Sequence, residues 1–478
     1  MSPRRLLGPC AAALGLAACA VGPRYQPPTT PPSASRPFVS SQAGVAEDQP
    51  LPPDWWRLYQ DPVLDSLVQR ALTENQDLKV AASNLAYAQA LVEEAKAGRY
   101  PTTDLSAGAT YGKSAQEAAA GAGAHMTWST GFTAAYQVDL FGRIRRTIEA
   151  ARANAEAVRG AEDAVRVTVA AETASAYASV CGLGEQLAVA RRSVDLVQQT
   201  YDITVRQRDA GALSDFDVAR EGVLLEQAKA AVGPLEGQRR SAVFTLAALI
   251  GRTPSEAPAE VQACVTPPRL AQALPVGDGA ALLRRRPDIR EAERALAAQT
   301  ARIGVATADY FPTVTLGGSV SSSAGGVGQL FSAATTAFTG GPLVTWSFPN
   351  ITVAHAHVAE ADAQAQAALA GFDSVVLQAL KESEQALSAY AAELDRQRAL
   401  GLARQHADEA LRLAQIQYQA GGASFLDLLQ AQAALVGADQ AVAVSDQAIS
   451  ADQVAVFQAL GGGWETAPPV TLPKLGTP

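Results

Sequence analysis

The amino-acid sequence repeats itself at a distance of about 210 residues, and this repetition constrains the fold more than any other feature. The matching positions are glycines, serines and aspartates in the runs RQRDAGALSDFDV and IQYQAGGASFLDL: Gly211, Ser214 and Asp217 correspond to Gly421, Ser424 and Asp427. The offset of 210 persists without a gap to Gly251 and Gly461, and upstream an offset of 211 relates Pro101 to Pro312. We interpret the chain as a tandem duplication of roughly residues 64–252 and 276–463, joined by a linker at 253–275 and followed by a tail at 464–478.

Residues 1–18 have the form of a secretory signal peptide, because Arg4 and Arg5 precede a short apolar stretch. The stretch ends in Leu-Ala-Ala-Cys, which resembles the lipobox of bacterial lipoproteins and predicts acylation of Cys19; the alternative is an ordinary cleavage site with an incidental cysteine. Residue 20 is alanine and not the aspartate of inner-membrane retention, so we expect the outer membrane as the destination. Residues 19–63 are rich in proline, which favours an extended strap docked by Trp55 and Trp56.

The mature chain is acidic. Removal of residues 1–18 takes away two arginines and no acid, so 36 basic residues face 47 acidic ones and the net charge is −11. Without a basic cluster the chain has no electrostatic footprint for nucleic acid. After Cys19 there is no run of 18 or more apolar residues, which excludes an apolar transmembrane helix.

Four segments alternate between apolar and polar residues, as strands with two different faces do. We predict strands at about 102–112 and 126–140 in the first repeat and at about 313–322 and 337–348 in the second. Aromatic residues such as Trp128 and Phe338 sit on the apolar faces, which favours strands that face lipid over a water-facing sheet packed on helices. Pro342 cannot donate to a ladder, so we expect a local irregularity in the fourth strand.

Four strands cannot close a ring in lipid, where every backbone donor and acceptor must be paired. The strands must therefore be pooled between chains, and three copies supply twelve.

Each repeat also contains a helix too long for an ordinary globular domain. From Gly142 to about Arg208 no proline occurs, and apolar residues recur at spacings of three and four, so we predict about 100 Å of coiled-coil-like helix. Gly211 then turns the chain and Ser214 caps a shorter returning helix; Gly421 and Ser424 do the same after the second long helix. Each repeat is thus strand, strand, long helix, shorter helix.

The sequence resembles the TolC-like outer membrane factors, in particular the lipoprotein branch (NodT/OprM-like) that serves RND-type multidrug efflux pumps. The matching segments extend from one end of the mature chain to the other: 19–25 (CAVGPRY), 54–56 (DWW), 139–143 (DLFGR), 286–289 (RPDI) with Ala292 and Glu293, and 459–464 (ALGGGW).

This resemblance implies an α+β membrane protein that forms, as a homotrimer, a 12-stranded outer-membrane β-barrel continued by a long periplasmic α-helical barrel. It implies an exit channel of a Gram-negative bacterium, anchored by diacylglycerol and N-acyl groups on Cys19. It further implies contact of the periplasmic tips, at Gly211, Ser214, Asp217, Gly421 and Ser424, with a membrane fusion (adaptor) protein and thereby with an inner-membrane RND pump.

In relatives the tip is narrowed by a leucine and, one helical turn later, an aspartate. The leucine position falls on Leu426, but the aspartate position falls on Gln430, so this sequence departs from a charged gate at that level. Asp427 is one candidate for the missing charge; the alternative is an ordinary carboxylate at a helix N-terminus.

Two cysteines remain once Cys10 is cleaved away and Cys19 is acylated. Counted along the helices from the turn at Gly211, Cys181 and Cys264 lie at similar heights, which permits a disulfide in the oxidising periplasm. Two small buried thiols are the alternative.

Catalytic and cofactor motifs are missing: no P-loop, GxSxG or CxxC occurs, and His355 and His357 do not share a helix face, so we expect neither an enzyme, a metal site nor a cofactor. Two other functions fit parts of the pattern. A type I secretion exit duct for polypeptides would use the same architecture, whereas a trimeric coiled-coil surface protein would not need strands between the helices of both repeats.

Overall fold

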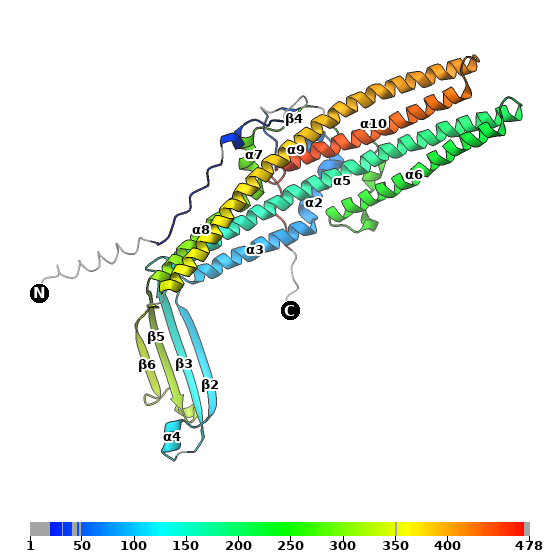
Figure 1. The fold of residues 1–478 in the computed structure, drawn as a ribbon. Helices are drawn as coiled ribbons and strands as arrows, with labels where there is room; N and C mark the ends of the chain where they lie inside the picture. Colours follow the sequence, from blue (N-terminus) through cyan, green and yellow to red (C-terminus); the bar gives the residue numbers. More distant parts are fainter. Residues whose placement is uncertain are drawn as a thin grey trace. The chain divides into compact units, whose positions relative to one another are not determined.

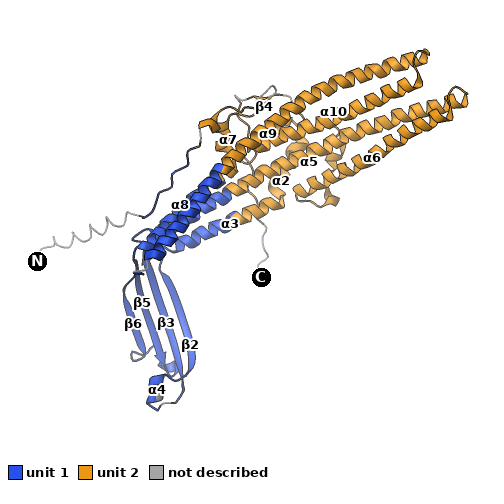
Figure 2. Ribbon diagram, viewed as in Figure 1, with its two compact units in different colours: residues 1–29, 85–159, 291–373 blue, residues 30–84, 160–290, 374–478 orange. Residues whose placement is uncertain are grey.

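The computed structural model describes residues 20–30, 32–40, 45–46, 49–121, 123–270, 272–348 and 351–472. The signal peptide, the predicted acylation site Cys19, the predicted start of the second long helix near Asn350 and the last residues of the tail lie outside this range. The chain forms two compact units, and each unit draws on both repeats (Figure 2). Unit 1 contains residues 1–29, 85–159 and 291–373, and unit 2 contains residues 30–84, 160–290 and 374–478.

Unit 1 contains a four-stranded antiparallel sheet with the order β2-β3-β5-β6 (Figure 1). Its strands are β2 (Thr102–Gly112), β3 (His125–Val138), β5 (Thr313–Ala324) and β6 (Thr336–Thr345). A short helix, α4 (Ala115–Ala119), lies in the connection between β2 and β3. Within the described chain β2 and β6 each have a neighbour on one side only, so the sheet has two open edges.

The two faces of this sheet differ in polarity because the strands pair in register with their alternation. One row of cross-strand partners is entirely apolar and exposed: Leu105, Phe132, Val320 and Phe338. The next row, on the opposite face, is polar: Asp104, Thr133, Ser319 and Thr339. The alternation of each strand alone therefore becomes an apolar row that runs across all four strands on one face.

The prediction of a local irregularity at Pro342 is wrong. The pairing of β5 with β6 continues through the proline without a bulge, with Leu316 opposite Pro342 and Gly317 opposite Gly341. Within the described chain β6 has a neighbour on one side only, so the missing N–H of the proline need not interrupt its pairing with β5.

Long helices make up the rest of the fold, and the predicted order of strand, strand, long helix and shorter helix in each repeat is confirmed. The long helices are α5 (Arg143–Asp209) and α9 (Ile351–Gln419), followed by the returning helices α6 (Asp215–Leu249) and α10 (Phe425–Ala459). The helices before the strands are α3 (Gln76–Ala97) and α8 (Pro287–Thr307). Two shorter helices, α2 (Pro62–Glu74) and α7 (Gly279–Arg285), and the parallel strand pair β1 (Val45–Ala46) and β4 (Leu274–Pro275) complete the fold.

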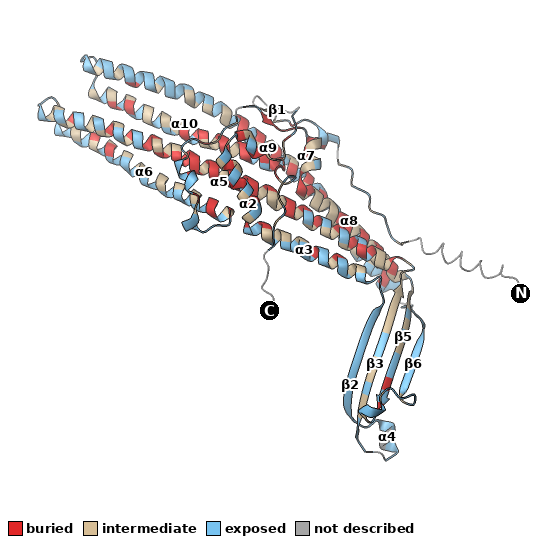
Figure 3. Cartoon of the chain, turned by 180° about the vertical axis from the view of Figure 1, so that it is seen from behind, coloured by how far each residue is buried: buried red, intermediate tan, exposed pale blue. Residues whose placement is uncertain are grey.

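Figure 3 shows buried segments on α5, α9 and α10. The hydrophobic core of unit 2 is built around Trp55, which is fully buried. Its ring stacks on that of Phe457 with centroids 4.6 Å apart, and its indole N–H donates to the carbonyl of Gly462 over 3.3 Å. Phe38 and Leu51 of the proline-rich strap belong to the same buried cluster. The strap is thus held to unit 2 by side chains from both ends of the chain.

None of the helices within the described residues is long and apolar enough to traverse a membrane.

Candidate functional site

The two helix turns, α5–α6 and α9–α10, lie at the same end of unit 2 (Figure 1). In the first turn Gly211 has φ +79°, and in the second Gly421 has φ +76°, a left-handed conformation that glycine adopts without a Cβ penalty. Neither glycine has a neighbour within 4 Å of the position where a Cβ would stand, so both are required by backbone conformation and not by crowding. The duplication thus produces two helix ends of the same geometry.

A capping box begins each returning helix, as the serines at these positions predict. In the first, Asp217 Oδ2 accepts from Ser214 N at 3.0 Å and from Ser214 Oγ at 2.7 Å; the Asp427 carboxylate accepts from Ser424 at 2.9 and 2.6 Å. These hydrogen bonds lower the pKa of both carboxyl groups. The bond from the serine side chain contributes most, and the bond from the serine backbone N–H comes next. Both aspartates are therefore anions that serve their own helix ends.

The two turns differ in the pair that closes them. In the first, Arg208 forms ion pairs with Asp209 at 2.8 Å and with Asp215 at 3.0 Å. At the positions 210 residues later, Tyr418 and Phe425 replace Arg208 and Asp215, and their rings lie 5.9 Å apart. One turn is thus closed by charge and the other by aromatic contact.

Tyr418 also links the two repeats, because its hydroxyl donates to Gln207 Oε1 over 2.8 Å and so joins α9 to α5. Sequence reasoning missed this link. Tyr418 occupies the position in the second repeat that Arg208 occupies in the first. This replacement of a charged residue by an aromatic one was a sign in the sequence that the two turns differ.

The predicted gate residues all lie on the first turns of α10. Leu426 is 38% exposed, and Gln430, four residues later, is exposed on the same helix face. Asp427 lies beside them, but its carboxylate is held by the capping box. The capping box therefore fully explains Asp427 as an ordinary carboxylate at a helix N-terminus, which was the alternative to a role in the gate.

In unit 1 the N-terminal strap is fastened where β3 gives way to α5. Val21 N–H donates to the carbonyl of Phe141 at 3.1 Å, and the guanidinium of Arg146 donates to the carbonyls of Val21 and Gly22, both at 3.0 Å. A Cβ on Gly142 would lie 2.6 Å from Ala20, so only glycine fits there. Residue 20 is therefore fixed at the strand–helix boundary, immediately after the predicted acylation site.

Cys181 of α5 and Cys264 form a disulfide in unit 2, with Cα atoms 4.8 Å apart. Arg239 of α6 supports the same loop, because its guanidinium donates to the carbonyls of Gln262 at 2.6 Å and Cys264 at 2.9 Å. A Cβ on Gly184 would approach the Cys264 carbonyl to 2.4 Å. The linker is thus tied to both helices of the first repeat.

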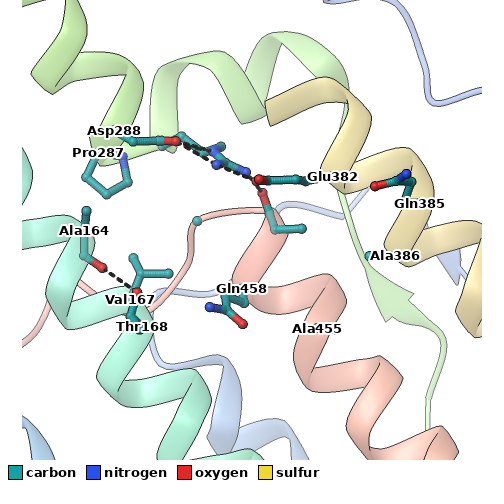
Figure 4. A pocket seen from close by; sticks show the side chains of 13 residues that line it. Ala164, Val167, Thr168, Pro287, Asp288, Glu382, Gln385, Ala386, Ala455 and Gln458 are labelled. Carbon is teal, nitrogen blue, oxygen red and sulfur yellow. Dashed lines mark hydrogen bonds and ion pairs between the residues drawn. The ribbon is translucent and has the colours of Figure 1, made fainter. Parts of the chain in front are cut away.

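Another network is centred on the buried Arg286, and Figure 4 labels its acidic partners Asp288 and Glu382. Its guanidinium donates to Asp288 Oδ2 at 2.7 Å, to Glu382 Oε2 at 2.9 Å and to the carbonyl of Ala459 at 2.8 Å. A Cβ on Gly461 would lie 2.7 Å from the Arg286 side chain. Two sequence segments that carry the family resemblance, 286–289 and 459–464, therefore meet at one structural site.

His357 Nδ1 lies 3.1 Å from Asp309 Oδ2, and Asp309 also pairs with Arg143. Across the residues that the structure describes, no three histidine, cysteine or acidic side chains are grouped so that they could hold a metal ion.

Comparison with known proteins gives consistent matches along nearly the whole chain. The model of the family "Outer membrane efflux protein" matches twice, at residues 67–252 and 280–462. Nodulation protein T of Rhizobium leguminosarum bv. trifolii is 31% identical over 430 residues, which cover 88% of this chain and 89% of that protein. Outer membrane protein OprJ of Pseudomonas aeruginosa is 30% identical over 466 residues, which cover 95% of each. The solved structure of the outer-membrane channel OprN has a TM-score of 0.86 at 34% identity and covers 93% of this chain and 100% of its own.

Proposed function

Because this chain belongs to the outer membrane efflux protein family and is an efflux channel of the Gram-negative outer membrane, we propose that it works as a homotrimeric exit duct. In this role it takes small molecules from an adaptor and an inner-membrane RND pump. Transport is passive and leaves the substrate covalently unchanged, so the protein acts without an enzymatic step or a cofactor.

The observation that carries the proposed trimer is the sheet of unit 1. On one face an apolar row crosses all four strands, and the sheet has two open edges, β2 and β6. An open sheet edge in lipid leaves backbone groups unpaired at a cost of several kcal/mol each. Three copies would join these edges into a closed ring of twelve strands.

Light scattering tests the assembly directly. Detergent-solubilised protein is expected at about three times the protomer mass, and planar bilayers are expected to show stable conductance. A stable single-chain protein with its full β-content would contradict the proposal.

The partners are proposed from the paired helix turns at Gly211 and Gly421. These turns present two similar capped ends at one end of unit 2, a repeated surface suited to the repeated hairpins of an adaptor. Affinity purification from cells is expected to recover an adaptor together with an RND pump. Recovery of a secretion ATPase instead would assign the protein to type I secretion of polypeptides.

We place the gate at the second turn, where Leu426 and Gln430 share an exposed helix face. Leu426→Ala is expected to raise single-channel conductance by removing bulk from the aperture, and Gln430→Asp to restore the negative charge usual in relatives and so increase cation selectivity. Unchanged conductance and selectivity in an intact trimer would place the constriction elsewhere.

Asp427 requires a matched control because its carboxylate also caps α10. Asp217→Ala removes the same capping contact from the other turn. If Asp427 contributes charge to the gate, Asp427→Ala changes ion selectivity and Asp217→Ala does not. Equal effects would assign both residues to helix capping alone.

The lipid anchor is proposed on Cys19. The anchoring of Val21 and Gly22 by Arg146 supports this assignment, because it holds the neighbouring residue 20 at the end of the lipid-facing strands. Intact-protein mass spectrometry is expected to find the mature chain beginning at Cys19 with a diacylglycerol and an N-acyl group. A mature chain without added lipid would contradict this assignment.

A further inference from the structure

The open edges β2 and β6 have an internal counterpart. Within one chain, β3 ends the strand pair of the first repeat and β5 begins that of the second, and these two strands pair along eleven positions. Because the repeats are duplicates, the junction from β3 to β5 is equivalent to a junction from β6 to the β2 of a second copy. The intrachain pair therefore carries the geometry of the intermolecular one.

The equivalence can be fixed to the residue. Strand β2 begins at Thr102 and β5 at Thr313, which is the offset of 211 already present in the sequence. Thr102 pairs with Ala135 and Thr313 pairs with Thr345, so β3 corresponds to β6 with an offset of 210. The same offset of 210 relates α5–α6 to α9–α10, so the one extra residue belongs to the first repeat and lies between β2 and β3, not in the helices.

We propose that β6 pairs antiparallel with β2 of a second copy in the register that β3 and β5 adopt within one chain. Tyr136 pairs with Leu316, Ala135 with Gly317, and Ala134 with Gly318. Transfer through the two offsets places Trp346 opposite the partner's Leu105, Thr345 opposite the partner's Ser106, and Val344 opposite the partner's Ala107. The inference rests on the proposed homotrimer and specifies its strand interface.

The ends of the strands support this register. Residues 136–138 of β3 are strand although β2 stops pairing at Ala135, because β5 continues to pair with them through Val138. Their counterparts are residues 346–348, which lie just beyond the end of β6. Trp346 is 54% and Phe348 is 70% exposed. Within the described part of one chain, residues 346–348 lack the neighbouring strand that β5 provides for residues 136–138. This is expected if a second copy supplies that strand.

The polarity of the two faces supports the same register. Leu105 and Ala107 lie on the apolar face, in line with Phe132 and Thr130, and Val344 and Trp346 lie on that face of β6. The proposed pairs of Val344 with Ala107 and of Trp346 with Leu105 therefore join apolar residues on one face. A slip of one residue would move one entire strand to the opposite face.

Cysteine cross-linking tests the register. The in-register variants are Val344→Cys with Ala107→Cys, and Thr345→Cys with Ser106→Cys; one of two successive antiparallel pairs is always a close, non-hydrogen-bonded pair. The slipped controls are Val344→Cys with Leu105→Cys and Val344→Cys with Ala109→Cys. They keep both thiols on one face but separate them diagonally by about 7–8 Å, beyond the usual disulfide span.

At least one in-register variant is expected to run as covalently linked two- and three-chain species on a non-reducing denaturing gel, and to collapse to one chain on reduction. The slipped controls and each single-cysteine variant are expected to remain single chains. The native thiols do not interfere, because Cys181 and Cys264 are bonded to each other.

The outcomes separate the register from the assembly. Cross-linking of a slipped control, or of no pair in a protein whose mass is three chains, would overturn the register while the trimer stands. A single-chain mass for the wild-type protein would overturn the assembly and the pairing together.

Discussion

At the scale of single residues, Glu221 on α6 differs from the other charged groups of the helices. The side chain is fully buried, and both carboxylate oxygens lack a hydrogen-bond partner within the described residues. Burial raises its pKa from the ordinary 4.5 to about 7, although nearby Arg220 acts in the opposite direction. The sequence could not reveal that Glu221 is buried, because a glutamate on a helix normally faces solvent. Its burial depends on how the helices pack in the folded chain.

Glu221→Gln is expected to change the pH dependence of stability. Between pH 4.5 and about 7 the folded chain binds a proton that the unfolded chain has released, so the stability of the wild type falls as pH rises through this window. The variant lacks this loss and is expected to be more stable than the wild type by up to about 3 kcal/mol at pH 8, with little difference near pH 4.5. Melting temperatures measured from pH 4.5 to 8 check this.

The matched control is Glu226→Gln, five residues further along the same helix, where the carboxylate is 72% exposed and pairs with Lys229 at 2.9 Å. Its melting curve is expected to follow the wild type within about 0.5 kcal/mol at every pH. Parallel pH profiles for Glu221→Gln and the wild type would show that Glu221 gains a partner in the assembled protein.

At the scale of elements, much of the architecture could be predicted because its signals are local. Alternation located the strands, glycines located the helix turns, and Ser214 and Ser424 marked the N-caps of α6 and α10. The error at Pro342 has a physical origin: a proline interrupts a ladder only on the side that its nitrogen faces, and a single sequence does not show which strand lies on that side. Contacts such as that of Tyr418 with Gln207 depend on packing between repeats and were missed for the same reason.

Ser424→Ala is expected to loosen the start of α10 by about 1 kcal/mol, because the Ser424 hydroxyl accepts from the Asp427 N–H and donates to its carboxylate. Hydrogen exchange of the amides in the first turn should accelerate about five-fold, whereas Ser424→Thr, which keeps the hydroxyl, should exchange at the wild-type rate. Unchanged exchange in the alanine variant would show that contacts to other chains hold this turn.

The disulfide is a second element-scale device, because it joins α5 to the linker across a separation of 83 residues. Replacing Cys181 and Cys264 by serine is expected to lower the free energy of unfolding by about 4 kcal/mol, since the unfolded chain loses a long covalent loop. Denaturant titration measures the change, and wild-type protein treated with reductant is the control. In non-reduced, denatured wild-type protein we expect no alkylation of either cysteine; alkylation of both would contradict the bond.

At the scale of the whole molecule, function depends on surfaces that one chain leaves incomplete. The single chain already carries the apolar row of the sheet, the open edges and the paired helix ends. The duplication explains why the edges and the helix ends occur in two similar versions. The sequence could predict that strands must be shared between chains from the number of strands alone. It could not predict the register, which required the observed pairing of β3 with β5 and the offsets fixed by the pairings of β2 with β3 and of β5 with β6.

Phe132→Lys and Thr133→Lys form a matched pair for the orientation of the sheet, because the two neighbouring residues point to opposite faces of β3. A lysine on the apolar face is expected to cost about 2–4 kcal/mol in the bilayer, so Phe132→Lys should reduce the amount of folded protein in isolated outer membranes. Thr133→Lys is expected to insert normally and to alter ion selectivity. A reversed pattern would place the apolar row in the interior.

The contact of Trp55 with Gly462 has a consequence for biogenesis. These residues are 407 positions apart, yet the indole and the glycine carbonyl meet in one core. During export the chain emerges from its N-terminus, so Trp55 reaches the periplasm long before its partners and must remain uncovered until almost all of the chain has crossed. Periplasmic holding chaperones are therefore expected to bind the segment around Trp55 and Trp56 first and to release it last.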